Sequence, residues 1–139
     1  MARIIAIDYG TKRTGIAVTD PLQIIANGLD TVPTNQIFDY LKDYLSQEAV
    51  ETIVVGEPLH LDGSPAQIAP LVEAFKKKLR ELFPQVLVVD QDERFTSEEA
   101  KKAILMSGAK KKKRQDKALV DKISAVIILQ EYLERTRYQ

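Results

Sequence analysis

The sequence predicts an α/β fold in which a five-stranded mixed sheet has helices on both faces. Short apolar runs of strand length alternate with longer segments in which apolar residues recur at helical spacing. Three strand-like segments come first and are separated only by turns, and the full order is β-β-β-α-β-α-β-α-α. Adjacent strands favour an antiparallel meander, and helical crossovers favour parallel strands added to it.

The amino-terminal half supplies the meander. Its expected strands cover residues 3–8, 14–19 and 24–32. The first is a continuous apolar run that ends on Asp8, which is typical of a strand buried on both faces. Asn27 and Gly28 interrupt the third, and we expect a bulge there rather than a hairpin tip because the flanking segments are short.

The rest of the chain predicts helices in alternation with strands. The expected helices cover residues 35–48, 67–83, 96–107 and 116–135, and the expected strands cover 52–56 and 86–89. Thr96 and Glu99 have the spacing of a capping box, and Gly108 suits the residue after a helix end. Asp116 suits the cap of the last helix. No internal repeat or linker appears, so residues 1–139 are expected to form one domain.

The composition is that of an ordinary soluble protein, with 45% hydrophobic and 29% charged residues. Cysteine is absent, which excludes disulfides and thiolate chemistry and fits a cytoplasmic location. No window reaches the roughly 18 consecutive apolar residues of a membrane span. The first apolar run is too short for a signal peptide, so we expect no membrane partner.

The net charge of zero hides an uneven distribution of charge. Residues 101–122 contain nine cations and two aspartates, a net charge of +7. A basic segment on a neutral protein is typical of a polyanion-binding surface. A solvated lysine-rich loop remains the alternative interpretation of this charge run.

Acidic residues recur where the predicted sheet ends. Asp8 closes the first strand, the segment DQDER (residues 90–94) follows the fifth, and Asp121 lies in an otherwise apolar helix beside Ser124 and Ala125. Ligands bind open α/β sheets at the carboxyl ends of their strands. A carboxylate in a buried helix needs a partner or a metal ion, and small neighbours would let that helix approach the sheet closely.

Three carboxylates from separate elements suit Mg²⁺ or Mn²⁺, because hard divalent cations take oxygen ligands. Two such ions about 4 Å apart can activate water and stabilise the leaving oxygen of a phosphodiester. Two alternatives remain open. Asp8 also suits a turn, and Asp121 also suits an ion pair with Lys117 or Lys122.

Four segments carry a family resemblance: AIDYGTKRTGIAVTD, VVGEPLHLDGS, DERFTSEEA and LVDKISAVIILQEYL. They look like the sequence blocks of the YqgF (RuvX-like) family of small bacterial proteins, and they are spread in order over nearly the whole chain. The resemblance implies a ribonuclease-H-like fold of the Holliday-junction-resolvase type. It also implies a nuclease that matures the 5′ end of the precursor of small-subunit (16S) ribosomal RNA.

Carried onto this chain, the resemblance implies that Asp8, Glu93 and Asp121 are the catalytic acids and the metal ligands. Glu93 is preferred to its acidic neighbours because the family block is DER, whereas spacing alone does not choose. The expected charge-assisted contacts with the nucleic-acid backbone come from Lys12, Arg13, Arg94, Lys110, Lys111, Lys112, Lys113 and Arg114. With 6% aromatic residues and no tryptophan, recognition by backbone and shape is expected.

Two residues near the fourth predicted strand remain open. Glu57 follows Gly56, where relatives commonly have an apolar residue, and it suits either a fourth acidic ligand or a surface substitution. His60, the single histidine, suits a general acid or substrate contact, or an exposed or packing role.

Three functions fit these observations. A nuclease acting on precursor ribosomal RNA, and so on ribosomal-subunit precursors, ranks first. A DNA junction resolvase ranks second, because cutting two strands in register needs a symmetric dimer and the lack of an obvious dimerisation helix favours a monomer. A non-catalytic RNA- or ribosome-binding factor ranks third. An actin or sugar-kinase fold needs two such domains, and 139 residues are too few for both. A Rossmann dinucleotide-binding fold does not fit either, because no G-x-G-x-x-G follows a strand.

Overall fold

The computed structural model describes residues 2–58, 66–92, 102–103 and 117–137. The strands are β1 (Arg3–Asp8), β2 (Arg13–Thr19), β3 (Ala26–Pro33), β4 (Val50–Glu57) and β5 (Leu87–Asp92). The helices are the 3₁₀ turn η1 (Thr34–Gln36), α1 (Ile37–Gln47), α2 (Ala69–Leu82) and α5 (Lys117–Arg137). In the described part of the chain, no helix has the length and apolarity that crossing a membrane requires.

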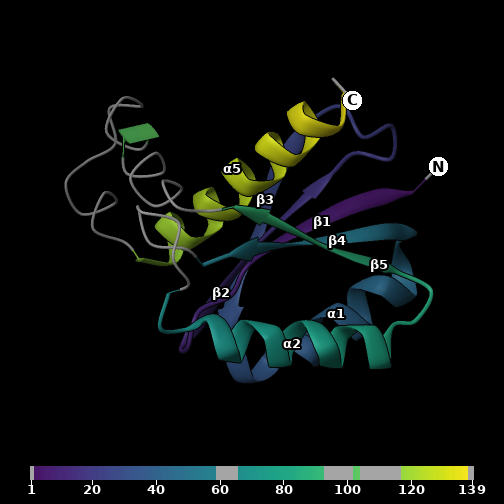
Figure 1. Cartoon of the computed structure of the whole chain (residues 1–139). Helices are drawn as coiled ribbons and strands as arrows, with labels where there is room; N and C mark the ends of the chain where they lie inside the picture. Colours follow the sequence, from purple (N-terminus) through teal and green to yellow (C-terminus); the bar gives the residue numbers. More distant parts are fainter. Residues whose placement is uncertain (1, 59–65, 93–101, 104–116, 138–139) are drawn as a thin grey trace.

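The five strands form one mixed sheet in the order β3-β2-β1-β4-β5 (Figure 1). β1 pairs antiparallel with β2, and β2 pairs antiparallel with β3, so the predicted meander is confirmed. β4 and β5 extend the sheet in parallel on the other side of β1. The most apolar strand is therefore central, as expected for a segment buried on both faces.

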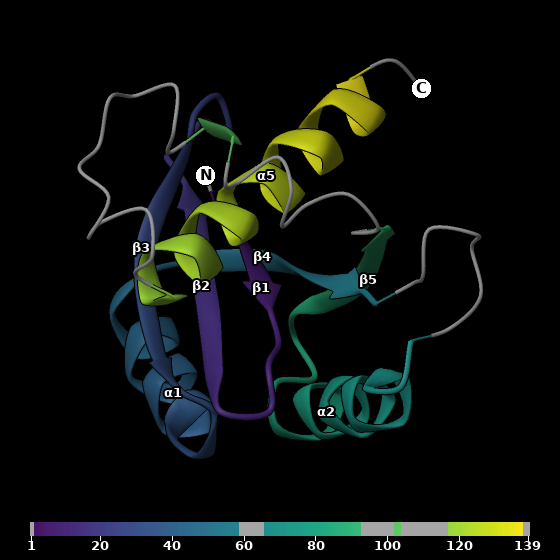
Figure 2. The ribbon, with the colours of Figure 1, turned by 90° about the vertical axis from the view of Figure 1, so that its left-hand side faces the viewer.

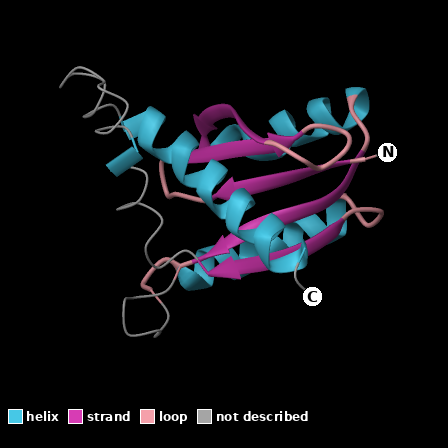
Figure 3. Cartoon of the chain, turned by 90° about the horizontal axis from the view of Figure 1, so that it is seen from above, coloured by secondary structure: helices cyan, strands magenta, loops and turns pink. Residues whose placement is uncertain are grey.

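The two faces of the sheet pack against different helices, which confirms the prediction of helices on both sides. α1 and α2 cover one face, called here the α1/α2 face, and α5 covers the other, called the α5 face (Figure 2). The α1/α2 face carries Ile5, Ile7, Ile16, Ile53 and Val55, and the α5 face carries Ile4, Ala6, Ala17 and Val54. Seen from above, α5 runs obliquely across the strands (Figure 3).

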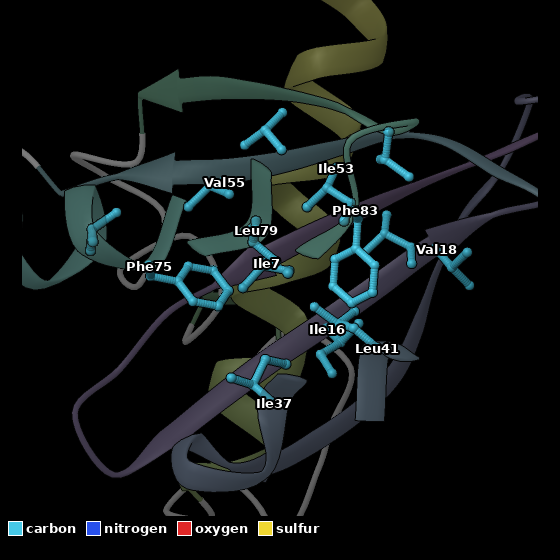
Figure 4. Packing of buried hydrophobic residues seen from close by; sticks show 14 of the residues in the cluster. Ile7, Ile16, Val18, Ile37, Leu41, Ile53, Val55, Phe75, Leu79 and Phe83 are labelled. Atoms are coloured by element: carbon cyan, nitrogen blue, oxygen red, sulfur yellow. The ribbon is translucent and has the colours of Figure 1, made fainter. Parts of the chain in front are cut away.

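The main core lies on the α1/α2 face. Ile37 and Leu41 of α1, together with Phe75 and Leu79 of α2, pack against the isoleucines and valines of the sheet (Figure 4). Within each helix these side chains are four residues apart, which places them on one side of that helix. Burial of this apolar surface is the largest favourable contribution to folding.

The bulge predicted in the third strand is confirmed. Ile16 of β2 pairs with Asp30 of β3, and the next residue of β2, Ala17, pairs with Gly28. Leu29 is therefore the extra residue on β3. Asn27 pairs with Val18 and thus belongs to the ladder rather than to a hairpin tip.

The start of the third strand was predicted two residues too early. Ile24 and Ile25 lie outside β3 because their backbone N–H groups donate to the Asp20 carboxylate, each at 2.8 Å, instead of to a neighbouring strand. The same hydrogen bonds, that of Ile25 first among them, lower the pKa of Asp20. A side chain that satisfies local backbone donors competes with the ladder.

Other predicted boundaries also shift. The first helix begins with the 3₁₀ turn η1, β4 begins at Val50 rather than at residue 52, and α5 extends to Arg137. β5 continues from the predicted end at residue 89 through Asp92, because its polar residues still pair with β4. Of the helix predicted over 96–107, Lys102 and Ala103 are described and helical, and the rest lies outside the described residues, as does the cap Asp116.

Candidate functional site

Asp8 ends the central strand on the α5 face. Side chains alternate along a strand, and β1 places Ile4 and Ala6 on the α5 face but Ile5 and Ile7 on the opposite face. Asp8 follows Ile4 and Ala6 in this alternation and therefore lies on the α5 face. It is half-buried at the carboxyl edge of the sheet, where the sequence analysis expected a ligand-binding acid.

Gly15 lets α5 approach this edge closely. It pairs with Asp8 across β1 and β2, and a Cβ atom there would overlap the backbone carbonyl oxygen of Asp121. The next turn of α5 buries Ser124 and Ala125, which are 1% and 0% exposed. The prediction that small residues bring this helix onto the sheet is confirmed, and Figure 2 shows the first turns of α5 over β2 and β3.

Arg13 and Asp121 form an ion pair that the sequence does not predict. The Arg13 Nε donates to Oδ2 of Asp121 at 3.0 Å, with side-chain exposures of 39% and 25%. From the sequence, Asp121 is expected to bind metal or to pair with a nearby lysine, and Arg13 to contact phosphate. The two residues are 108 positions apart, so only the folded sheet brings them together. A partly exposed guanidinium is therefore held directly beside an acid of the predicted site.

The basic turn between β1 and β2 is anchored to η1 by Thr34. Its hydroxyl donates to the Gly10 carbonyl at 2.6 Å, and its backbone N–H donates to the Lys12 carbonyl at 2.9 Å. Gly10 is required because a Cβ atom there would overlap the Arg13 carbonyl oxygen. Lys12 itself is exposed. No sequence pattern marked Thr34 as the residue that fixes this turn.

Asp90 belongs to a different cluster on the α1/α2 face. The ammonium of Lys76, a side chain only 4% exposed, donates to Asp90 at 2.6 Å and lies 2.6 Å from Glu73. Burial alone lowers the pKa of Lys76, but its hydrogen bonds to these carboxylates outweigh that effect, so the net shift is upward. Asp90 thus joins α2 to β5 and does not lie with Asp8.

The pairing register of β4 and β5 determines which face of the sheet the last residues of each strand occupy. Gly56 pairs with Gln91 and Glu57 pairs with Asp92. Alternation from Val55, which lies on the α1/α2 face, puts Gly56 on the α5 face and Glu57 back on the α1/α2 face. Glu57 is exposed there, on the face opposite to Asp8, which argues against its interpretation as a fourth ligand.

Two buried polar atoms have no hydrogen-bond partner within the described residues. They are Oε1 of Gln91 and Oγ of Ser124. Gln91 shares the side of β5 that carries Val89, which packs against the cluster under α5. Both atoms therefore belong to the α5 face rather than to the main core.

Several predicted site residues lie outside the described residues, so the structure does not place them. They are Glu93, Arg94, Lys110, Lys111, Lys112, Lys113, Arg114 and His60. Of the three predicted acids, Asp8 and Asp121 are described. The described ranges contain no group of three or more acids or histidines with metal-site geometry.

Comparison with known proteins gives matches over the full length. A family model described as "RuvX: Holliday junction resolvase" matches residues 2–135. A protein from Parabacteroides distasonis, named "Putative pre-16S rRNA nuclease", is 57% identical over 139 residues, which are 100% of this chain and 99% of that protein. A protein of the same name from Flavobacterium johnsoniae is 50% identical over 138 residues, covering 99% and 100% of the two chains.

Solved structures give a much weaker likeness. YeaZ from Pseudomonas aeruginosa aligns with a TM-score of 0.41 and 18% identity, over 78% of this chain and 50% of that chain. The structure of Pelota from Archaeoglobus fulgidus aligns with a TM-score of 0.45 and 17% identity, over 98% and 37%. These scores are too low to support a functional comparison.

Proposed function

Since the chain belongs to the RuvX family, with its ribonuclease-H-like fold, we propose that it is a metal-dependent nuclease that matures the 5′ end of precursor 16S ribosomal RNA. The family resemblance predicted from the sequence is confirmed. The observation that carries the proposal is the arrangement of Asp8 and Asp121, which β1 and α5 bring to one edge of the α5 face. The names of the relatives support the choice of substrate.

The oxygen groups of the α5 face fit a hard divalent cation. Two carboxylates lie at this edge, and the oxygens of Gln91 and Ser124, which have no hydrogen-bond partner among the described residues, lie on the same face. Asp8, Glu93 and Asp121 would hold Mg²⁺ or Mn²⁺. A divalent ion held there would supply an activated water and would stabilise the leaving oxygen of the phosphodiester.

The chain's own cations would hold the substrate. Arg13 is oriented by its bond to Asp121 and remains 39% exposed, so its guanidinium is available to a phosphate oxygen at the same edge. Lys12 lies in the adjoining turn, which Thr34 anchors. Arg94 and the basic run Lys110 to Arg114 would add contacts along the backbone, so binding should weaken as salt concentration rises.

A DNA junction resolvase is the second candidate, because the matching family model is described as a Holliday junction resolvase. Paired incision would need two copies of the site in a symmetric dimer.

As the proposed nuclease, the chain is expected to act as a monomer on ribosomal-subunit precursors in the cytoplasm.

The proposal is tested by cleavage of a labelled 16S precursor fragment and, in parallel, a four-way DNA junction. Each reaction contains Mg²⁺, Mn²⁺ or a chelator, and bound substrate is measured separately. Cutting of the precursor that chelator abolishes is the expected result. Cutting of the junction alone would replace the proposal with the resolvase, and binding without cutting under either metal would overturn the nuclease.

A further inference from the structure

Ser124 is a buried hydroxyl without a visible structural reason. It is 1% exposed, and its Oγ has no hydrogen-bond partner among the described residues. A buried polar group left unsatisfied costs about 1–3 kcal/mol, and such groups are rare in native proteins. The adjacent Ala125 is also fully buried and packs in the apolar cluster under α5. The hydroxyl therefore calls for a partner that is not part of the described chain.

The position of Ser124 follows from its neighbours on α5. It comes three residues after Asp121, so the two side chains lie on the same side of the helix. The Asp121 carbonyl contacts Gly15, and Ala125 packs in one cluster with Ala6 and Ala17. Ser124 thus lies over β1 and β2, at the boundary between the apolar cluster and the acidic edge.

Gln91 reaches the same edge from β5. Ile7 pairs with Val55 across β1 and β4, so the next residues, Asp8 and Gly56, stand side by side. Gly56 in turn pairs with Gln91. Asp8 and Gln91 are therefore separated on the α5 face by a residue that has no side chain, about 10 Å apart at their backbones. Gly56, which is itself buried, thus lies between a carboxylate and an amide oxygen that has no hydrogen-bond partner among the described residues.

We propose that Ser124 and Gln91 are positioning residues whose neutral oxygens hold the water shell of a divalent cation bound at Asp8 and Asp121. The inference rests on the proposed function. Mg²⁺ and Mn²⁺ keep several water ligands when carboxylates bind them, and metal-bound water donates hydrogen bonds. Gln91 Oε1 is an acceptor and Ser124 Oγ can accept, so both match such donors.

This arrangement also has an electrostatic advantage. A further carboxylate would bind the cation more tightly, but it would repel the phosphate that must approach the same edge. Neutral oxygens orient the water without adding charge. The positive charge of Arg13, which is bonded to Asp121, offsets the negative charge of that carboxylate and so reduces its repulsion of an anionic substrate.

The test is a titration of the intact protein with Mn²⁺, in which electron paramagnetic resonance reports the free ion. Ser124→Ala and Gln91→Leu are each expected to weaken Mn²⁺ binding about tenfold, as other groups that orient metal ligands do. Without metal, both variants should be as stable as the wild type or more stable, because each removes an unsatisfied buried group. Ser46→Ala and Gln130→Leu, which alter exposed side chains, are the matched controls.

The outcomes separate this inference from the proposed function. If the wild type binds Mn²⁺ and Asp8→Asn abolishes binding, but Ser124→Ala and Gln91→Leu bind as the wild type does, the inference is wrong and the metal site stands. Weaker binding accompanied by a lower melting temperature without metal would indicate a packing role and would also overturn the inference. If the wild type binds no Mn²⁺, the metal site and the inference both fail.

Discussion

The two faces of the sheet are built differently. On the α1/α2 face large aliphatic and aromatic side chains pack together, and the buried Lys76 has two carboxylate partners. On the α5 face alanines of the sheet and helix allow close approach, and two polar oxygens have no partner within the described chain. One face therefore supplies most of the apolar burial, whereas the other leaves two buried oxygen atoms without partners among the described residues.

The largest change in stability should come from the α1/α2 face. Leu79 is 0% exposed, and Leu79→Ala should lower the free energy of unfolding by about 3 kcal/mol, through lost burial and a cavity. Urea denaturation measures this loss. Leu71→Ala, at a position 51% exposed on the same helix, is the control and should cost much less.

Leu79→Ala also tests whether the two faces of the sheet are independent of each other. At a temperature where Leu79→Ala is folded, its rate of precursor cleavage should match that of the wild type, because the cavity forms on the face away from Asp8. A large loss of cleavage by the folded variant would show that the faces are not independent.

A smaller change in the free energy of unfolding is expected from the ion pair between Lys76 and Asp90, and its size should depend on which partner is removed. Asp90→Ala leaves the buried Lys76 ammonium without its partner on β5 and should cost about 2 kcal/mol. Lys76→Met should cost less than about 1 kcal/mol, because Asp90 and Glu73, 43% and 68% exposed, remain hydrated. Denaturation at pH 7 compares the variants, and equal losses would contradict this interpretation.

The pH dependence of the ion pair has a definite sign. The pKa of Lys76 is raised above its usual 10.5, so the folded state binds the proton more tightly than the unfolded state. The stabilisation is fully present below pH 10.5 and is lost as the pH rises through the higher folded value. In Lys76→Met this part of the alkaline loss of stability should disappear.

Much of the fold could be predicted because it depends on local patterns. The apolar run before Asp8 marked β1 as central, and short turns followed by helical crossovers gave the antiparallel and parallel pairings. The end of β5 was missed because Asp90, Gln91 and Asp92 are polar. They nevertheless pair along β4, since backbone hydrogen bonding does not depend on side-chain polarity.

The site could be predicted only in part. Ser124 and Ala125 correctly indicated the side of α5 that faces the sheet. The bond between Arg13 and Asp121 joins residues far apart in the chain, and nothing local to either residue specifies the other. That Gln91 Oε1 has no hydrogen-bond partner within the described part of the chain is likewise a property of the assembled sheet and helix.

We propose that the acidic edge of the α5 face carries out cleavage while the rest of the molecule supports it. The most direct measurement is the single-turnover rate of precursor cleavage by Asp8→Asn, beside the exposed control Asp43→Asn, with melting temperature and RNA affinity measured in parallel. We expect Asp8→Asn to cut at least about 100-fold more slowly, because a carboxylate that holds the metal is lost. Its stability and RNA binding should be retained, and the control should match the wild type. Cleavage by Asp8→Asn at the rate of the control would contradict the claim.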